Sequence, residues 1–404
     1  MTKKLLIHAA ILLAAFSFLR AQNLVLGDEV LLSERMDLIL GKNIGVVSNT
    51  SAVLSTGELF IDALLKRSDI KIGSIFALEH GFDLRSGAGA LIDDSYLEQI
   101  KVHSVYGSLK KPTPEMLADL DVIIFDVQDI GARFYTYISS MRYFMEACAE
   151  NNVKFVVLDR PNPLGGKHAE GPVLEDNFKS FIGIDNIPVL HGMTVGELAL
   201  FFNDRIQKKA DLVVVQMKNY DRTKFYDELN IPWSDPSPNI VNFETALLYP
   251  LIVFFEGTNI SEGRGTYTPF NIIGAPFVDK NELRKLTETE MGKFLEVRPV
   301  EFVPVAIEDK TPNPKYENDI CQGIQLKIKY RELYQPVRWS VNLIYLVHKL
   351  YPDQFEMKPY FDLLWGTDKI RLAIGAGKTP EEIVESWQPK LREFNELRKN
   401  YLLY

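Results

Sequence analysis

The sequence contains very little cysteine and histidine. Cys148 and Cys321 are its two cysteines, and six histidines are scattered over 404 residues. Two cysteines without CxxC spacing allow at most one disulfide, which excludes a disulfide-rich scaffold and gives no sign of a metal site. Since Cys148 lies in a segment of helical character, we expect buried free thiols.

The sequence also lacks an excess of positive charge. Asp and Glu number 54 against 45 Lys and Arg, which gives a net charge of −9. This balance provides no basic surface for phosphates, so we expect no nucleic-acid partner. A hydrophobic fraction of 46% over this length is typical of a globular chain with two or three domains.

Long apolar runs are absent except at the N-terminus. Leu5 to Leu19 is apolar, follows Lys3 and Lys4, and leads to Ala21 as a small residue for cleavage. This order predicts a secretory signal peptide over residues 1–21. The alternative is a membrane anchor, but the run is short for a span of ~20 residues. We therefore expect a secreted, periplasmic protein without a stable membrane anchor.

Apolar runs alternate with helical patterns through the first half of the remaining chain. The expected strands are 43–48, 72–78, 102–106, 122–127, 155–158 and 212–217. The expected helices are 55–67 after the capping box Ser55 to Glu58, 112–120, 134–150, and 194–202 after the capping box Thr194 to Glu197. Continuous apolar strands between helices indicate an α/β fold with a parallel sheet covered on both faces.

The second half of the chain is more mixed. Residues 232–239 are rich in Pro, Ser and Asn and predict a loop or a domain junction. Residues 247–255 fit a helix or a buried strand, 325–330 fit a strand, and 341–350 and 380–401 fit helices. We therefore expect the parallel-sheet domain over 22–240 and a smaller α+β domain over 241–404.

Charged and polar side chains follow several of the expected strands. They are Glu79, His80, Asp126, Asp129, Asp159, Arg160 and Asn162. Since ligands of open parallel sheets bind beyond the carboxyl ends of the strands, these residues predict an acidic cleft suited to acid/base hydrolysis. Glu79 is our candidate general acid because it lies at the mouth of an apolar strand. The alternative is a carboxylate that only caps a loop.

Further candidates come from loops and from one helix start. Glu170 lies in a glycine-rich loop that could fold over the cleft, with a solvated side chain as the alternative. His191 precedes a capped helix, where a substrate-binding neutral imidazole and a structural histidine are both open. Arg264 could hold a substrate carboxylate through a forked hydrogen bond. A metal hydrolase using His80, His103 and His191 is a weak alternative, because no HxxxH or HxD spacing occurs.

Seven uninterrupted motifs cover nearly the whole chain after residue 22. They are EHGF (79–82), KPTPEML (111–117), DVQDIGARFYTY (126–137), DRPNPLGG (159–166), EGP (170–172), HGMT (191–194) and FEGTNISEGRG (255–265). Together they resemble the NamZ-type exo-β-N-acetylmuramidases, a family long described only as a domain of unknown function. The resemblance implies a Rossmann-like N-terminal domain, a smaller C-terminal α+β domain that closes a cleft, and no cofactor or metal.

The resemblance also implies a reaction, the release of N-acetylmuramic acid from the non-reducing end of peptidoglycan fragments. Glycosidic cleavage commonly uses a carboxylic acid and a second carboxylate. We assign these roles to Glu79 and Glu170, although the 2-acetamido group of the substrate could replace the second. The expected substrate-binding residues are His80, Asp126, Asp129, Arg133, Arg160, Asn162, His191, Asn259, Glu262 and Arg264. Among them Arg133, Arg160 and Arg264 are the candidate partners of the lactyl carboxylate, and Phe82, Tyr135 and Tyr137 could pack against a sugar face.

One loop departs from the family pattern. The family usually continues EHGF with Arg-Gly and later has Ala-Gly-Glu, whereas this chain has Asp83-Leu84 and Ala88-Gly89-Ala90. The missing glutamate leaves a second hypothesis open, a non-catalytic or altered-specificity muropeptide-binding protein on the same scaffold.

Overall fold

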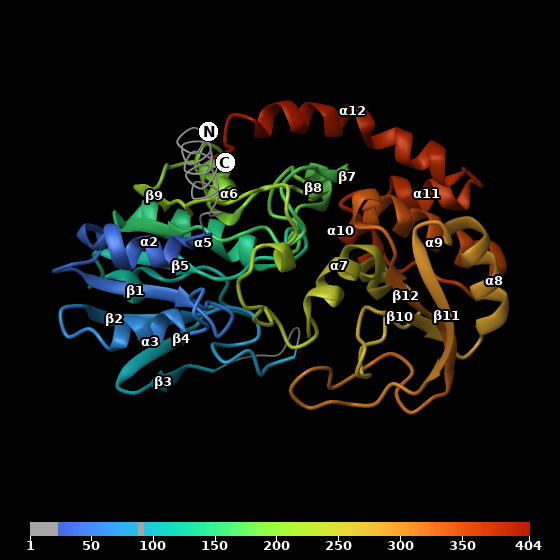
Figure 1. The fold of residues 1–404 in the computed structure, drawn as a ribbon, viewed down its shortest axis with the longest axis horizontal. Coiled ribbons are helices and arrows are strands. Elements are labelled where there is room, and N and C mark those ends of the chain that lie inside the picture. Colours follow the sequence, from blue (N-terminus) through green and yellow to red (C-terminus); the bar gives the residue numbers. More distant parts are fainter. Residues whose placement is uncertain (1–22, 88–92) are drawn as a thin grey trace, which may run out of the picture.

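The computed structural model describes residues 23–87 and 93–404 (Figure 1). The predicted signal peptide and the departure at Ala88 to Ala90 lie outside these residues. Within the described part of the chain, no helix combines the length and the apolar character needed to cross a membrane.

A seven-stranded sheet forms the centre of the N-terminal half. Its strands are β1 (Asn43–Ser48), β2 (Lys71–Ala77), β3 (Ser95–Leu97), β4 (Ile100–Ser104), β5 (Val122–Asp126), β6 (Lys154–Leu158) and β9 (Leu212–Val215). Their order is β3-β4-β2-β1-β5-β6-β9, and all neighbours are parallel except β3 and β4. Without β3, the order counted along the chain is 3-2-1-4-5-6, which is the Rossmann order. The predicted Rossmann-like parallel sheet is confirmed.

Helices cover both faces of this sheet because both faces of its strands are apolar. Side chains of successive residues point to opposite faces of a strand. In β5, Val122 and Ile124 join a core with α2 (Gly27–Glu34) and α3 (Phe60–Leu65). Ile123 and Phe125 join the core that contains α5 (Tyr137–Asn151) and α6 (Val195–Asn203).

The two predicted capping boxes have different outcomes. Thr194 Oγ1 accepts the Glu197 N–H at 3.2 Å and the Glu197 carboxylate accepts the Thr194 N–H at 2.9 Å, so the box before α6 is confirmed. The prediction at Ser55 is wrong, because α3 begins only at Phe60 and the Ser55 hydroxyl donates to Glu29 instead.

The C-terminal half is a smaller α+β unit, as predicted. Its antiparallel sheet has the order β10 (Ile272–Ala275), β12 (Cys321–Ile328) and β11 (Leu295–Phe302). Its helices are α7 (Phe243–Ile252), α8 (Lys280–Met291), α9 (Pro336–Leu350), α10 (Pro359–Trp365), α11 (Lys369–Gly375) and α12 (Pro380–Arg398). Residues 247–255 are therefore helical. Cys148 and Cys321 are buried and free, as expected.

The remaining elements are short, and the C-terminal helix and tail connect the two halves. The remaining elements are α4 (Pro114–Leu117), β7 (Glu170–Val173), β8 (Pro188–Leu190), and the 3₁₀ turns η1 (Met36–Leu38), η2 (Asp176–Phe178), η3 (Tyr226–Glu228), η4 (Val253–Gly257) and η5 (Arg331–Leu333). Helix α12 runs along the molecule from the C-terminal half to the N-terminal half (Figure 1). At its end, Arg398 donates to the carbonyls of His191 and Gly192, and the Tyr404 hydroxyl donates to Asp159 at 2.7 Å.

Candidate active site

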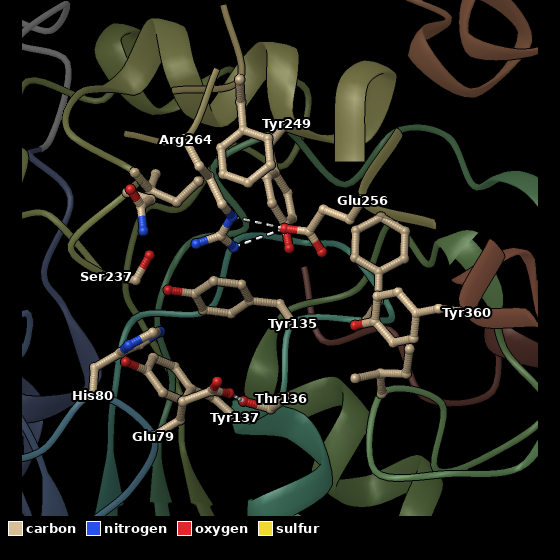
Figure 2. Close-up of a pocket in the computed structure, with 15 residues that line it drawn as sticks. Glu79, His80, Tyr135, Thr136, Tyr137, Ser237, Tyr249, Glu256, Arg264 and Tyr360 are labelled. Atoms are coloured by element: carbon tan, nitrogen blue, oxygen red, sulfur yellow. Dashed lines mark hydrogen bonds and ion pairs between the residues drawn. The ribbon is translucent and has the colours of Figure 1, made fainter. Parts of the chain in front are cut away.

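A cavity of about 90 Å³ lies between residues of the two halves, beyond the carboxyl end of β2 (Figure 2). Its lining is rich in tyrosines and contains two carboxylates and one arginine. The residues are Glu79, His80, Phe134, Tyr135, Thr136, Tyr137, Ile182, Ser237, Asn239, Ile240, Tyr249, Glu256, Arg264, Phe270 and Tyr360. This location agrees with the rule that open parallel sheets bind ligands at their carboxyl edge.

Glu79 contributes a fixed carboxyl group to the cavity. It follows β2 by two residues and is 9% exposed. The Tyr106 hydroxyl donates to its Oε1 at 2.8 Å, and the Thr136 hydroxyl, just before α5, donates to its Oε2. Two hydroxyl groups from different elements therefore hold the carboxyl in one orientation, which a proton-transfer group requires.

His80 turns the chain immediately after Glu79. Its φ of 73° lies in the left-handed region, which non-glycine residues rarely adopt outside functional or tightly determined positions. Its Nδ1 lies 2.7 Å from the Ser86 carbonyl oxygen, so the ring is fixed beside the cavity. Burial lowers the pKa of His80, although the neighbouring Glu79 carboxylate opposes this effect.

Glu256 and Arg264 form the opposite wall of the cavity (Figure 2). Arg264 donates from Nε and Nη2 to one oxygen of Glu256 at 3.0 and 2.7 Å. Burial raises the pKa of Glu256, and the Arg264 charge opposes that rise. Glu262 lies 3.6 Å from Arg264 Nε, and although burial acts to raise its pKa, Lys315 at 2.9 Å and Arg264 outweigh burial and lower it.

Tyrosine rings separate the two acidic walls. Tyr135 and Tyr360 lie between Glu79 and Glu256 (Figure 2). Tyr249 meets Tyr135 edge to face, with ring centroids 6.3 Å apart. The Tyr137 hydroxyl accepts from Asn49 at 3.0 Å and donates to the Pro236 carbonyl at 2.7 Å. Apolar ring faces with polar edges are suited to a sugar, whose C–H faces pack on rings while its hydroxyls need partners.

The cavity adjoins a more open depression of about 300 Å³. Glu256 and Arg264 line both spaces, and Lys310 and Lys315 line the depression. Lys315 is held by Glu262 and by the carbonyls of Phe255 and Ile260. The site is therefore a small inner cavity beside a wider space with basic side chains.

The structure brings Glu79, His80, Glu262 and Arg264 together at this site. Tyr135 and Tyr137, which we expected to face sugar, line the cavity as well. Phe82 instead packs against the core on the α3 side of the sheet.

Asp126 and Arg160, both expected to bind substrate, form a buried ion network instead. Arg160 donates from two nitrogens to Asp126 and reaches Asp28 at 2.6 Å. All three side chains are at most 2% exposed. Burial raises the pKa of Asp28 to about 7, and the Arg160 charge opposes it. This placement favours a structural role, because opposite charges compensate each other away from the cavity lining.

Asp129, Asn162 and His191 gather at another place. Asp129 accepts the Gly131 N–H at 2.7 Å and lies 3.6 Å from His191 Nε2, and Asn162 donates to the Met193 carbonyl at 3.0 Å. They are buried and do not line the Glu79 cavity.

Arg133 and Asn259 bind backbone groups. Arg133 donates to three carbonyl oxygens, those of Pro172, Ile187 and Leu364, and burial lowers its pKa to about 9. Asn259 donates to the Gln354 carbonyl at 2.7 Å. Both side chains hold distant segments together.

Glu170, our expected second carboxylate, lies at the first turn of α9. It accepts the Arg338 N–H at 2.7 Å and the Val337 N–H at 3.4 Å. It lines a separate cavity of about 160 Å³ that shares no residue with the Glu79 cavity. Glu256, which the sequence reasoning did not select, faces Glu79 instead.

Several other lining residues were also missed. Tyr249 and Tyr360 come from separate segments that no local pattern marks, whereas Ser237 and Asn239 lie in the predicted junction 232–239. Glu256 had a signal in the sequence, because it follows an apolar run and precedes Gly257 directly. Glu79 has a similar setting, with His80 between it and Gly81. Within residues 23–87 and 93–404, no group of three or more His, Cys, Asp and Glu side chains is arranged to hold a metal ion.

A Rossmann-like domain with a cavity of carboxylates and tyrosines at its carboxyl edge is suited to a carbohydrate-active hydrolase. Comparison with known families makes this specific. Residues 44–244 match the N-terminal model and residues 247–404 the C-terminal model of the exo-beta-N-acetylmuramidase NamZ. The chain belongs to this family and is a glycoside hydrolase.

Individual relatives agree with this assignment. The peptidoglycan beta-N-acetylmuramidase NamZ of Bacillus subtilis (strain 168) is 41% identical over 383 residues, which cover 94% of this chain and 91% of the relative. Two solved DUF1343 family proteins from Bacteroides fragilis have the same fold, with TM-scores of 0.86 and 0.77 at 32% and 31% identity. Each comparison covers 95% of this chain and 99% of the other.

Proposed function

We propose that this protein releases N-acetylmuramic acid from the non-reducing end of peptidoglycan-derived glycans, and that Glu79 protonates the leaving oxygen. The observation that carries the proposal is the position of Glu79, whose carboxyl group is fixed by two hydroxyls inside a tyrosine-lined cavity. Proton donation to the glycosidic oxygen is the step that a carboxylic acid supplies in most glycosidases.

The shape of the site supports action at a chain end. A cavity of about 90 Å³ is smaller than a whole N-acetylmuramic acid, so in our proposal part of the terminal sugar enters it and the rest of the glycan lies in the adjoining depression of about 300 Å³. An endo-acting enzyme would need a groove open at both ends, so that sugars could extend on either side of the cleaved bond.

The second carboxyl group in our proposal is Glu256. It lies across the cavity from Glu79, whereas Glu170 lines another cavity. Glu256 could act as the partner carboxylate or orient the 2-acetamido group if that group assists the reaction.

Arg264 is our proposed partner for the lactyl carboxylate. Of the three arginines considered from the sequence, Arg264 is the one that lines the cavity, and we assign its Nη1 to the ligand because Nε and Nη2 donate to Glu256. Arg133 and Arg160 lie outside the cavity lining and donate to carbonyls and to buried aspartates. Lys310 lines the adjoining depression with Arg264 and adds positive charge for an anionic substrate.

The test is turnover of an aryl N-acetylmuramide by the purified protein, compared with the matched N-acetylglucosaminide. We expect release of the aryl group from the muramide and much slower release from the glucosaminide, because only the muramide carries the lactyl carboxylate. Saturable binding of muramyl glycans without any turnover would overturn the proposal in favour of a binding protein.

We also propose that the protein is secreted to the periplasm, on the basis of the N-terminal sequence. Cell fractionation should then place the mature chain, shortened by about 21 residues, in the periplasmic fraction. A full-length chain in the cytoplasmic fraction would contradict this.

A further inference from the structure

The cavity that contains Glu170 has the features of a ligand site, although it is separate from the Glu79 cavity. Its volume is about 160 Å³, and an apolar cavity of ~150 Å³ holds a ligand as large as benzene. Four of the seven sequence motifs contribute to its lining through Gly131, Asn162, Glu170 and Gly192. The proposed glycosidase mechanism uses none of these four residues.

One of the residues that line this cavity is a half-buried carboxylate, Glu170. Glu170 accepts two backbone N–H groups, and an ionised carboxylate has about four acceptor positions. Among the described residues, no cationic side chain forms an ion pair with Glu170 within 4 Å. Burial raises the pKa of Glu170 to about 7, while the N–H groups of Arg338 and Val337 and the Arg338 charge oppose that rise. Because the opposing effects do not offset burial, a ligand ammonium group at this carboxylate would further stabilise its charged form.

The walls and the rim have different chemistry. The side chains of Leu164, Leu190, Phe225 and Tyr334 form apolar walls, and the Phe225 and Tyr334 rings meet edge to face at 5.5 Å. Lys167 at the rim is exposed and takes part in no ion pair within the described chain. Negative charge inside, apolar walls and positive charge at the mouth match a short molecule with an ammonium end, an apolar body and a carboxylate end.

We propose that this cavity binds a small apolar amino acid or dipeptide with free termini. The ammonium group meets Glu170, the side chain packs on the apolar walls, and the carboxylate meets Lys167. The proposal does not depend on the glycosidase activity, since the two cavities share no lining residue.

The test is calorimetric titration of the mature chain with alanyl-alanine and, separately, with free leucine. We expect saturable binding of at least one of them with a dissociation constant of about 1 mM or tighter. The ligand that binds more tightly, alanyl-alanine or leucine, shows whether the cavity prefers a dipeptide or an amino acid. N-acetylation of that ligand should weaken binding by about tenfold or more, because charge-assisted hydrogen bonds contribute ~1.5–3 kcal/mol.

Variants locate the site. Glu170→Gln should weaken binding of the free ligand and leave binding of its N-acetylated form unchanged. The substitution and the acetylation each remove the same interaction, that between the ligand ammonium group and the Glu170 carboxylate. Lys167→Ala changes an exposed residue and should not endanger folding. It should weaken binding of the free ligand but not binding of the ligand's C-terminal amide. Glu332→Gln, a carboxylate lining the same cavity, is the matched control and should change neither.

Three results would overturn the proposal. One is the absence of saturable heat for both ligands at tens of millimolar. Another is binding that Glu170→Gln and Lys167→Ala both leave unchanged. The third is binding abolished by Glu79→Gln, which would move the ligand to the other cavity.

Discussion

Replacing Glu79 by glutamine separates general acid catalysis from binding. The amide has the shape of the carboxyl group and keeps contacts with the hydroxyls of Tyr106 and Thr136, so the cavity should retain its form. It cannot donate a proton to a leaving oxygen. General acid catalysis typically contributes about 10²–10⁴-fold, which corresponds to ~2.7–5.5 kcal/mol of activation free energy.

The size of the loss should depend on the leaving group. A nitrophenolate leaves without protonation, whereas the oxygen of a second sugar does not. We therefore expect Glu79→Gln to reduce kcat by about 10²–10⁴-fold on a muramyl-glucosamine disaccharide and by far less on nitrophenyl muramide. Steady-state kinetics on both substrates give the ratio, with KM nearly unchanged.

A matched variant shows that the effect is local. Glu115→Gln removes an exposed carboxylate in α4 and should leave both substrates unaffected. The reasoning is refuted if Glu79→Gln retains wild-type turnover of the disaccharide. Equal losses on the two substrates would assign Glu79 to nucleophilic or electrostatic catalysis instead.

Three further predictions concern charge. Arg264→Lys should lower kcat/KM on the muramide by about 10–100-fold, and much less on the glucosaminide, because the forked donor is lost. Arg160→Met should lower the free energy of unfolding by about 3–5 kcal/mol in urea titrations, since it leaves Asp28 and Asp126 buried without a countercharge; an unchanged unfolding midpoint would contradict this. The folded-state pKa of Glu170, about 7, lies above the ordinary 4.5, so the stability it contributes is complete below pH 4.5 and is lost as the pH rises toward 7. Relative to wild type, Glu170→Gln should therefore gain up to about 3 kcal/mol between pH 5 and 8, measured by urea unfolding at each pH.

Much of the N-terminal fold could be predicted because its strands are apolar on both faces. Val122 to Phe125 alternate between two cores, and this two-sided burial is what a continuous apolar run indicates. The prediction of a capping box at Ser55 was wrong because the partner of this residue is distant in the sequence. Serine can cap a helix, but here its hydroxyl bonds Glu29, a residue 26 positions earlier, and no local pattern reports such a partner.

The candidate site was predicted only in part because one wall comes from each half of the chain. Glu79 and His80 are at a strand end, where topology predicts a ligand site. Glu256 follows a helix of the second half, and Tyr360 begins another. Their position opposite Glu79 depends on how the two halves pack, which the local sequence does not specify.

The strand-end charges also show why residue type alone does not identify a catalytic group. Asp126 ends β5 and Glu79 follows β2 at the same edge of the sheet, with β1 between the two strands, yet Asp126 is neutralised by Arg160, whereas Glu79 meets hydroxyl groups and a cavity. A carboxylate with a buried arginine has its charge compensated and its oxygens occupied. A carboxylate that lines a cavity and accepts hydrogen bonds from hydroxyls is placed to exchange a proton with a ligand. The partner therefore decides the role, and for Asp126 the partner lies 34 residues away.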